Sequence, residues 1–373
     1  MRMRGAAAWC AAALLVVTSG CADSGDAWNG SGQRSSDGGI KLTNCEGKTA
    51  TLAAPAKRIV TSNASALELL LRLGAGDRVI GTGFPPGRGS LPPDLDAEAR
   101  QVPALSKTVI PKEKLLGSGA DLYIDAFSAS GGRGMGEVAT EDEFRAAGIT
   151  HMYLTSTACP QDADGPLTDL SGVERDTRRL GEVTGTTRAA KQLVAAQREK
   201  LAGVRKALGD ASTGAGRPGY FVFDYDAGTK QPTVTCNRQI AHAVITLAGG
   251  RNVFADCDSA RRQVGWEDVV AKNPDWIQIA VRNRPTRSAT EDAFEKAESW
   301  LRTHPATRGL KAVRENHLLR LGSEVTTVPS VENATAVQVI AEALHPGVDF
   351  PDKAERSTAH AFTAEPSPSP GVR

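Results

Sequence analysis

The sequence lacks the short motifs by which most enzyme active sites are recognised. It has no H-E-x-x-H, no G-x-S-x-G, no P-loop and no G-x-G-x-x-G after a predicted strand. Its six histidines are scattered at positions 151, 242, 304, 317, 345 and 360, with no close pair. An exported enzyme is therefore only a remote alternative. A site for a bare zinc or manganese ion, which needs several histidines at strand ends, is disfavoured as well.

An excess of charge is also missing. The chain of 373 residues has 44 Lys and Arg against 43 Asp and Glu, without a Lys/Arg-rich run, so nothing indicates nucleic-acid binding. Aromatic residues make up only 5%, while the 40% hydrophobic content is ordinary for a soluble globular protein. The length favours two domains.

The first residues are typical of an export signal. Residues 1–20 begin with Arg2 and Arg4, continue with an apolar run and end in T-S-G before Cys21. The run is too short for an ordinary membrane span. The S-G-C sequence resembles a bacterial lipobox, which implies cleavage before Cys21 and lipidation of its thiol. A plain secretory signal followed by an incidental cysteine is the alternative.

Two further segments have the composition of flexible chain. Residues 21–44 are rich in Gly, Ser, Asp and Asn and predict a lipidated tether between the anchor and the folded part. Residues 348–373 turn polar and rich in Pro and Ser, which predicts a disordered tail.

The stretch TRAAKQLVAAQREKLAGVRKAL, residues 187–208, predicts one long helix. Apolar residues recur at the i, i+3, i+4, i+7 spacing of an amphipathic helix, interrupted by Gln197. Strand-and-helix patterns lie on both sides of it. The sequence therefore predicts two Rossmann-like α/β lobes with parallel sheets, at 45–170 and 216–347, joined by a helical connector at 171–208 that includes this rod.

The two lobes echo each other in sequence. IPKEKLLGSGADLYI, residues 110–124, aligns with VGWEDVVAKNPDWIQI, residues 264–279. In both, a Glu stands eight residues before an Asp: Glu113 before Asp121, and Glu267 before Asp275. Each segment predicts a short helix followed by a strand. Chance similarity between βαβ units is the alternative explanation.

Four cysteines remain beyond the export signal and the lipid site: Cys45, Cys159, Cys236 and Cys257. An even number in an oxidising compartment predicts two disulfides, for which three pairings exist. If the lobes divide at the long helix, Cys45–Cys159 and Cys236–Cys257 keep each bond within one lobe. No pair has C-x-x-C spacing, which disfavours zinc or redox chemistry.

Several segments carry a family resemblance: KRIVTSNASALELLLRLGAGDRVIGTG, GADLYI, AGGRNVFAD, VGWEDVVAKNPDWIQI and LKAVRENHLLRL. Together they resemble the substrate-binding lipoproteins of bacterial ABC importers, in the subgroup that delivers ferric siderophores, cobalamin and haem. The resemblance implies a monomer with no cofactor of its own. It implies a ligand captured between the lobes, with a ferric siderophore as the leading expectation. Cobalamin, haem or another bulky cofactor precursor are the alternatives.

The expected ligand contacts follow from the carboxyl ends of the predicted strands, where α/β sheets bind ligands. The positive charges of Arg and Lys attract an anionic chelate, and aromatic rings stack on its planar groups. The candidates are Asn63, Phe84, Lys107, Phe127, Tyr225, Arg238, Trp266, Arg282, Arg284 and Glu324.

The expected partners are an ABC permease dimer with its ATPase, and the membrane through the lipid on Cys21. In the family that the chain resembles, one surface Glu on each lobe meets Arg residues of the permease. These positions correspond to Glu113 and Glu267. Two ordinary exposed acids near helix N-termini are the alternative interpretation.

Overall fold

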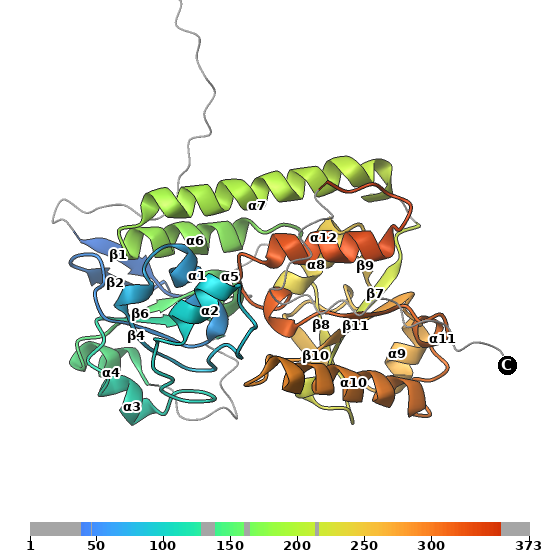
Figure 1. The fold of residues 1–373 in the computed structure, drawn as a ribbon, viewed down its shortest axis with the longest axis horizontal. Helices are drawn as coiled ribbons and strands as arrows, with labels where there is room; N and C mark the ends of the chain where they lie inside the picture. The colour runs from blue at the N-terminus through green and yellow to red at the C-terminus, as the bar shows by residue number, and fades with distance from the viewer. Residues whose placement is uncertain (1–38, 46, 128–138, 160–164, 213–215, 352–373) are drawn as a thin grey trace, which may run out of the picture. The chain divides into compact units, whose positions relative to one another are not determined.

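The computed structural model describes residues 39–45, 47–127, 139–159, 165–212 and 216–351. Within them the chain forms two α/β lobes with parallel sheets, and α6 (Ser171–Val183) and α7 (Thr187–Leu208) lead from the first lobe to the second (Figure 1). This confirms the predicted fold class. None of the helices in these ranges has the length and apolar character that a membrane span requires.

The first lobe is built on a four-stranded parallel sheet with the order β4-β3-β5-β6. Its strands are β3 (Ile59–Thr61), β4 (Val79–Thr82), β5 (Leu122–Asp125) and β6 (Thr150–Tyr153). Its helices are α1 (Ala64–Arg72), η1 (Gly76–Arg78), α2 (Pro93–Ala99), α3 (Lys112–Leu116), α4 (Glu141–Ala146) and α5 (Thr155–Ala158).

The second lobe contains a parallel sheet with the order β12-β11-β7-β9 and a small antiparallel pair, β8 with β10. The strands are β7 (Gly219–Asp224), β8 (Thr233–Thr235), β9 (Arg251–Asn252), β10 (Arg261–Gln263), β11 (Trp276–Ala280) and β12 (Leu318–Arg320). The helical segments are η3 (Gly209–Ser212), η4 (Tyr225–Ala227), α8 (Ile240–Leu247), α9 (Trp266–Lys272), α10 (Arg287–Thr303), α11 (Lys311–Arg314), η5 (Ser323–Val325) and α12 (Asn333–Leu344).

The two parallel sheets share one topology. Numbered within its own lobe, each sheet has the strand order 2-1-3-4. The acids of the sequence echo have matching roles, because each lies just before the third strand and holds the start of the first. Asp121 accepts hydrogen bonds from the backbone N–H groups of Lys57 and Arg58, at 2.8 and 3.1 Å, and Asp275 accepts one from Gly219 at 2.6 Å. The echo is therefore structural.

Helix α7 has the bounds that its periodicity predicts. Its buried face includes Val194, Gln197 and Val204, and α6 and α12 pack along it (Figure 1). Gln197, the polar interruption in the apolar stripe, donates from its amide to the backbone carbonyls of Ser330 and Val331, at 3.3 and 3.2 Å. This side chain therefore ties the helix to the segment that precedes α12.

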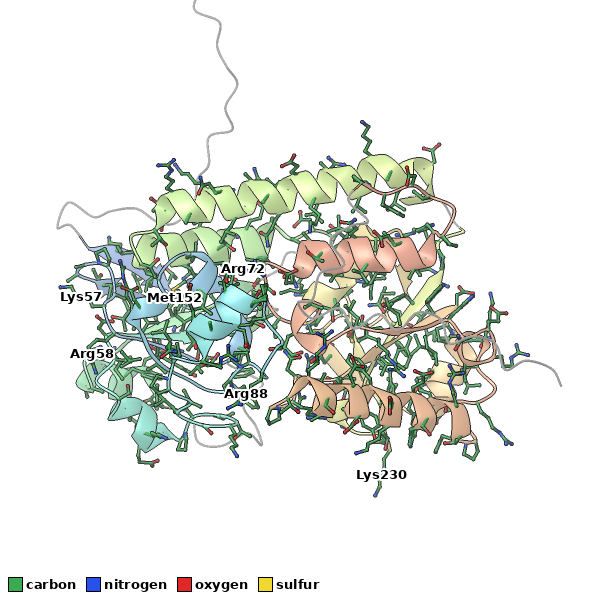
Figure 2. The ribbon with its side chains drawn as sticks, in the orientation of Figure 1. Lys57, Arg58, Arg72, Arg88, Met152 and Lys230 are labelled. Carbon is green, nitrogen blue, oxygen red and sulfur yellow. A yellow bond between two sulfur atoms is a disulfide. The ribbon has the colours of Figure 1, made fainter. Side chains whose placement is uncertain are left out.

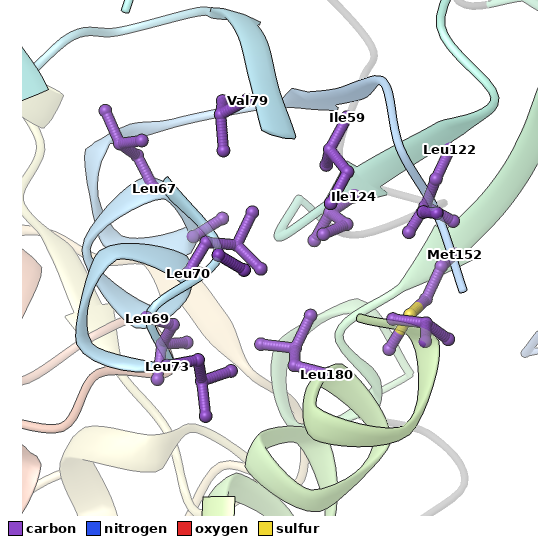
Figure 3. Packing of buried hydrophobic residues seen from close by; sticks show 14 of the residues in the cluster. Ile59, Leu67, Leu69, Leu70, Leu73, Val79, Leu122, Ile124, Met152 and Leu180 are labelled. Atoms are coloured by element: carbon purple, nitrogen blue, oxygen red, sulfur yellow. The ribbon is translucent and has the colours of Figure 1, made fainter. Parts of the chain in front are cut away.

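The core of the first lobe forms where α1 packs against the sheet (Figure 3). Leu67, Leu69, Leu70 and Leu73 follow helical spacing and are almost fully buried, so one helix face supplies most of the contact. The strands contribute alternating aliphatic side chains, and α6 adds Leu180. At about 25 cal/mol per Å² of buried apolar surface, this packing is the main stabilising contribution in the lobe.

Two predicted boundaries are wrong. The predicted tether 21–44 overlaps β1 (Ile40–Thr43), which pairs antiparallel with β2 (Thr49–Leu52) and buries Leu42. The predicted tail 348–373 begins too early, because Phe350 is 4% exposed and packs in the core of the second lobe. In both segments a few apolar residues, Ile40 and Leu42 in the first and Val348 and Phe350 in the second, pack on the core of a lobe, which composition alone does not reveal. The predicted export signal, the predicted lipid site Cys21 and the remainder of the predicted tail lie outside the described residues.

Both disulfides join cysteines of the same lobe. Cys45 bonds to Cys159 and Cys236 bonds to Cys257, with Cα–Cα distances of 5.3 and 5.1 Å. The first ties the β1–β2 hairpin to the end of α5. The second closes the loop between β8 and the residues after β9. Of the three pairings that the sequence allows, the structure forms the one that leaves the lobes covalently independent.

Candidate ligand-binding site

The shared strand order defines one special position in each sheet. The order 2-1-3-4 reverses direction between the first and third strands, which are β3 and β5 in the first lobe and β7 and β11 in the second. In open α/β sheets, ligands bind beyond the carboxyl ends of the strands at such a switch point. The loops that follow these four strands are therefore the candidate site.

The two switch points are built alike. In the first lobe, Ser62 after β3 accepts a hydrogen bond on Oγ from the backbone N–H of Ala126 after β5, at 2.9 Å. In the second lobe, Asp226 after β7 accepts one on Oδ2 from the backbone N–H of Arg282 after β11, at 2.7 Å. A polar side chain thus links the same two loops in each lobe.

The first lobe brings Phe84 and Phe127 together. Their rings lie edge to face with centroids 5.6 Å apart, and both side chains are half-buried. Phe84 adopts a φ of 35°, which is unusual for a bulky residue and marks a sharp turn straight after β4. These two predicted residues form one aromatic surface at the carboxyl edge of the sheet.

Two other predicted residues of this lobe lie differently. Asn63 is 8% exposed and its Oδ1 accepts from the N–H of Ala66 at 3.0 Å, so its side chain caps α1. Lys107 is exposed on the loop before α3. The structure therefore gives Asn63 a local folding role and leaves Lys107 accessible to solvent.

In the second lobe Asp226 organises the loop after β11. Besides holding the N–H of Arg282, its carboxylate pairs with the guanidinium of Arg284. Glu324 accepts the N–H of Asn283 at 2.7 Å from the neighbouring loop. Three predicted residues, Arg282, Arg284 and Glu324, are therefore gathered at one place. Arg282 is exposed, and among the described residues its guanidinium has no hydrogen-bond or ion-pair partner.

Trp266 is buried, although the sequence predicts it as a ligand contact. Its side chain is 7% exposed and packs among Phe221, Phe223 and Trp300, while its Nε1–H donates to the carbonyl of Thr229 at 2.7 Å. An aromatic residue at the start of a helix that covers a sheet becomes core because its apolar area is better buried than exposed. Trp266 is therefore a packing residue beneath α9.

The last two predicted residues stand apart from the loop that Asp226 organises. Tyr225 begins η4, directly before Asp226, and its ring lies edge to face against buried Phe223 at 6.0 Å. Arg238 follows the Cys236–Cys257 disulfide and pairs with Asp258 at 2.7 Å. The guanidinium lowers the pKa of the Asp258 carboxyl below its ordinary value. The charge of Arg238 is therefore already matched by a neighbour.

The described residues also line a hollow where the two lobes meet. It has a volume of about 220 Å³ and lies between α5, the start of α6 and the start of α8. Thr155, Arg175 and Ile240 are among its lining residues. Cofactor and drug-sized pockets have volumes of about 300–1,000 Å³, so this hollow by itself is smaller than the space such a ligand fills.

Glu113 and Glu267 occupy equivalent places in the two lobes. Each is the second residue of a short helix, α3 or α9, that leads into the third strand of its sheet, and each is exposed. Among the described residues neither carboxylate has an ion-pair partner. Exposed and equivalent carboxylates are what docking on a two-fold partner requires, and docking itself stays a prediction.

Sequence reasoning missed the organising role of Asp226 and the close approach of Gly87 to the backbone of Arg284. Both stand in loops directly after predicted strands, which is the one signal that pointed to them. Gly87 lies in the Gly/Pro-rich stretch PPGRGSLPP after β4. Which loops meet across two lobes depends on their relative placement, and no local pattern encodes it. Within the described ranges, no group of three or more His, Cys, Asp or Glu side chains is arranged to hold a metal ion.

Comparison with known proteins gives a consistent result. A family model described as "Periplasmic binding protein" matches residues 59–325. A cobalamin-binding protein of Halobacterium salinarum is 27% identical over 272 residues, which cover 72% of this chain and 66% of that protein. The chain thus spans slightly less than two thirds of the length of the curated relatives it matches.

Solved structures share the fold. A periplasmic binding protein from Veillonella parvula superposes with a TM-score of 0.67 at 23% identity, covering 82% of this chain and 97% of that chain. An ABC-type Fe3+-hydroxamate transport system structure from Saccharomonospora viridis gives 0.63 at 23% identity, with 81% and 98% covered. A periplasmic heme-binding protein from Roseiflexus gives 0.59 at 20% identity, with 78% and 98% covered.

Proposed function

The chain belongs to the periplasmic binding protein family, and from this premise we propose that it is the ligand-capturing component of an ABC importer. The family consists of substrate-binding proteins that act outside the cytoplasm and not of enzymes. The chain would capture a small molecule between its lobes and deliver it to a permease dimer that is driven by an ATPase. It would act as a monomer and need no cofactor of its own.

One observation carries this proposal. The two parallel sheets repeat one strand order, and at each switch point a side chain after the first strand holds the loop after the third. Paired lobes with matching carboxyl-edge loops suit a ligand that is bound from two sides. The long helix α7 is stiff over its 22 residues, which favours small lobe movements over wide opening.

The ligand we propose is a ferric siderophore. The loops at the carboxyl edges offer an aromatic pair, Phe84 with Phe127, together with the exposed cations Lys107 and Arg282. Ferric catecholates and carboxylate siderophores are anionic and carry planar groups, so a cation and an aromatic face both favour them.

Cobalamin is the second candidate, and a specific observation favours it. The curated relative that aligns over 72% of this chain is described as a cobalamin-binding protein. Haem is a third possibility on the same scaffold. Cobalamin binding would depend on the aromatic surface more than on Lys107 and Arg282, because these cations matter most for a ligand of negative charge.

Attachment and docking complete the proposal. A lipid on Cys21 would hold the protein at the outer face of the cell membrane, with the segment before β1 as the tether. Glu113 and Glu267 would meet basic residues of the permease, one on each of its two subunits. Their equivalent positions on α3 and α9 support this arrangement.

A thermal-shift panel tests the ligand class. The full chain is heated with a ferric hydroxamate, a ferric catecholate, ferric citrate, haem and cyanocobalamin, each with a metal-free counterpart where one exists. A ligand present at 100 times its dissociation constant stabilises the fold by about 2.7 kcal/mol, which raises the melting temperature measurably. A shift with one ferric chelate that disappears without iron supports the siderophore. A shift with cyanocobalamin alone replaces it by the second candidate.

A further inference from the structure

Two loops from different lobes touch at the carboxyl edges of the sheets. The backbone N–H of Arg88, in the loop after β4, donates to the carbonyl of Pro285, in the loop after β11, at 3.0 Å. Arg88 and Thr286 form an isolated parallel β-bridge. Figure 2 shows Arg88 beside the start of α10. A Cβ added at Gly87 would overlap the carbonyl oxygen of Arg284, so only glycine allows this approach.

The first-lobe side of the contact is held in shape before it meets the other lobe. The carbonyl of Gly87 accepts from the N–H and from the Oγ of Ser90, at 3.1 and 2.7 Å. The N–H of Gly89 donates to Asp96 of α2 at 3.0 Å, and the Asp96 side chain is largely buried. This loop is therefore a turn that is stabilised by its own hydrogen bonds and by a hydrogen bond to α2.

The second-lobe side is braced as well. Asp226 holds the backbone of Arg282 and the guanidinium of Arg284. The N–H of Arg284 donates to the hydroxyl of Thr290 in α10 at 2.9 Å. Two rigid turns that meet through backbone groups form a defined contact, because neither has to become ordered to make it.

We propose that these residues, Gly87–Arg88 and Arg284–Thr286, form a clasp that keeps the lobes together and parts to admit the ligand. The clasp joins the loops that follow a strand in each sheet, so it lies where a ligand would enter between the carboxyl edges. The ligand part of this inference rests on the proposed function. The clasp itself does not.

A single methyl group tests the clasp. Gly87→Ala places a Cβ against a backbone carbonyl, which cannot move aside as a flexible side chain would. Gly309→Ala is the matched control, because its Cβ meets nothing within 4 Å and its φ is not in the left-handed range. The two variants therefore differ in the clasp and not in the chemistry of the substitution.

Hydrogen exchange resolved to the Arg88 amide gives a readout without any ligand. In the full chain this amide is expected to be protected. Gly87→Ala is expected to speed its exchange about fivefold, the effect of losing one backbone hydrogen bond, while Gly309→Ala leaves it unchanged. An Arg88 amide that exchanges in the parent chain as fast as an unstructured peptide overturns the clasp. Equal exchange in both variants overturns the role of Gly87.

A covalent staple tests the need for parting, and it works even if Gly87→Ala fails to fold. Neighbouring strands lie about 4.8 Å apart, within the Cα range of a disulfide, so Arg88→Cys with Thr286→Cys is expected to oxidise. Mass mapping confirms that the native pairs stay intact. The oxidised staple is expected to slow binding of the anionic ferric catecholate ferric enterobactin, or of cyanocobalamin, at least about tenfold. Mild reduction that leaves the native disulfides intact restores the parent rate.

The outcomes separate the two claims. Equal binding rates for the oxidised and reduced staple overturn the requirement for parting. A double-cysteine chain that stays reduced under oxidising conditions, with its native disulfides formed, overturns the contact itself. If neither probe binds the parent chain, the proposed ligand class fails, while the exchange of the Arg88 amide still decides for or against the clasp.

Discussion

The imidazole of His151 lies 2.9 Å from the carboxylate of Glu141 although its side chain is only 1% exposed. On its other side Nε2 lies 3.7 Å from Asp125, and the ring packs against Tyr123, Phe144 and Tyr153. Burial lowers the pKa of His151, but the two acids outweigh it and raise the pKa above its ordinary value. The two acids thus favour the charged form of this histidine inside the first lobe.

This cluster predicts a pH-dependent stability. A raised pKa contributes stability that is complete below about pH 6.5, the value in the unfolded chain, and is lost as pH rises through the folded value. We therefore expect the urea midpoint to fall between pH 6 and pH 9. His151→Gln removes that decline, whereas His304→Gln in the second lobe keeps it. A decline of equal size in the His151 variant contradicts the assignment.

The acid side of the same pair behaves in the opposite way. The hydrogen bond from His151 lowers the pKa of Glu141, although burial opposes the shift. A lowered carboxyl pKa contributes stability above about pH 4.3 that is lost as pH falls through the folded value. Glu141→Gln removes this contribution. The stability lost between pH 5 and pH 2, followed by circular dichroism, is therefore expected to be smaller in the variant than in the parent chain. An unchanged acid transition argues against the pair.

The two disulfides should differ in their contribution to stability. In the loop-closure description a bond that closes 114 residues stabilises by about 5 kcal/mol, and one that closes 21 residues by about 3 kcal/mol. We expect Cys45→Ala with Cys159→Ala to lower the free energy of unfolding more than Cys236→Ala with Cys257→Ala. Urea unfolding of the two variants measures the difference. The reverse order would show that native packing around the bonds outweighs chain entropy.

Arg282 should matter for an anionic ligand. It is the exposed arginine of the loop that Asp226 organises, and no acid among the described residues matches its charge. Arg282→Ala is expected to weaken binding of a ferric catecholate about tenfold, which corresponds to about 1.4 kcal/mol. Arg308→Ala, an exposed arginine after α10, is the control. Calorimetry checks both, and an equal loss of affinity in the control refutes a specific role.

The docking carboxylates can be separated from ligand binding. Glu113→Ala and Glu267→Ala should each weaken association with the permease in vesicles, and the double variant should abolish it. Ligand affinity should stay unchanged, because both residues lie on short helices before the third strands and not in the loops beyond them. Glu295→Ala on α10 is the control. A loss of ligand affinity in the Glu variants would contradict a pure docking role.

Local patterns predict much of this fold. Helix α7 has its predicted bounds, because the spacing of apolar residues acts within one or two turns. The echo between residues 110–124 and 264–279 predicts two related lobes, and the shared strand order confirms it. The helix α10, 17 residues long, was not predicted, although Thr286 caps it from its side chain.

The site was harder to predict than the fold. The rule that ligands bind at carboxyl ends selects the correct loops, but it does not tell which side chains in them are already engaged. Asn63 caps a helix, Trp266 fills a core and Arg284 is paired with Asp226. The cap by Asn63 is local, because its partner Ala66 lies three residues away. The contacts of Trp266 and Arg284 join residues that are distant in sequence, so a short window does not encode them.

By itself the sequence determined the balance of charge, the α/β alternation and the rod between two lobes. These follow from short-range chemistry: side-chain period, turn residues and composition. Tertiary structure alone decided the pairing of the cysteines, the burial of Phe350 and the meeting of Gly87 with the carbonyl of Arg284. Such contacts bring together groups that are far apart in the chain, so only the packed lobes define their distances.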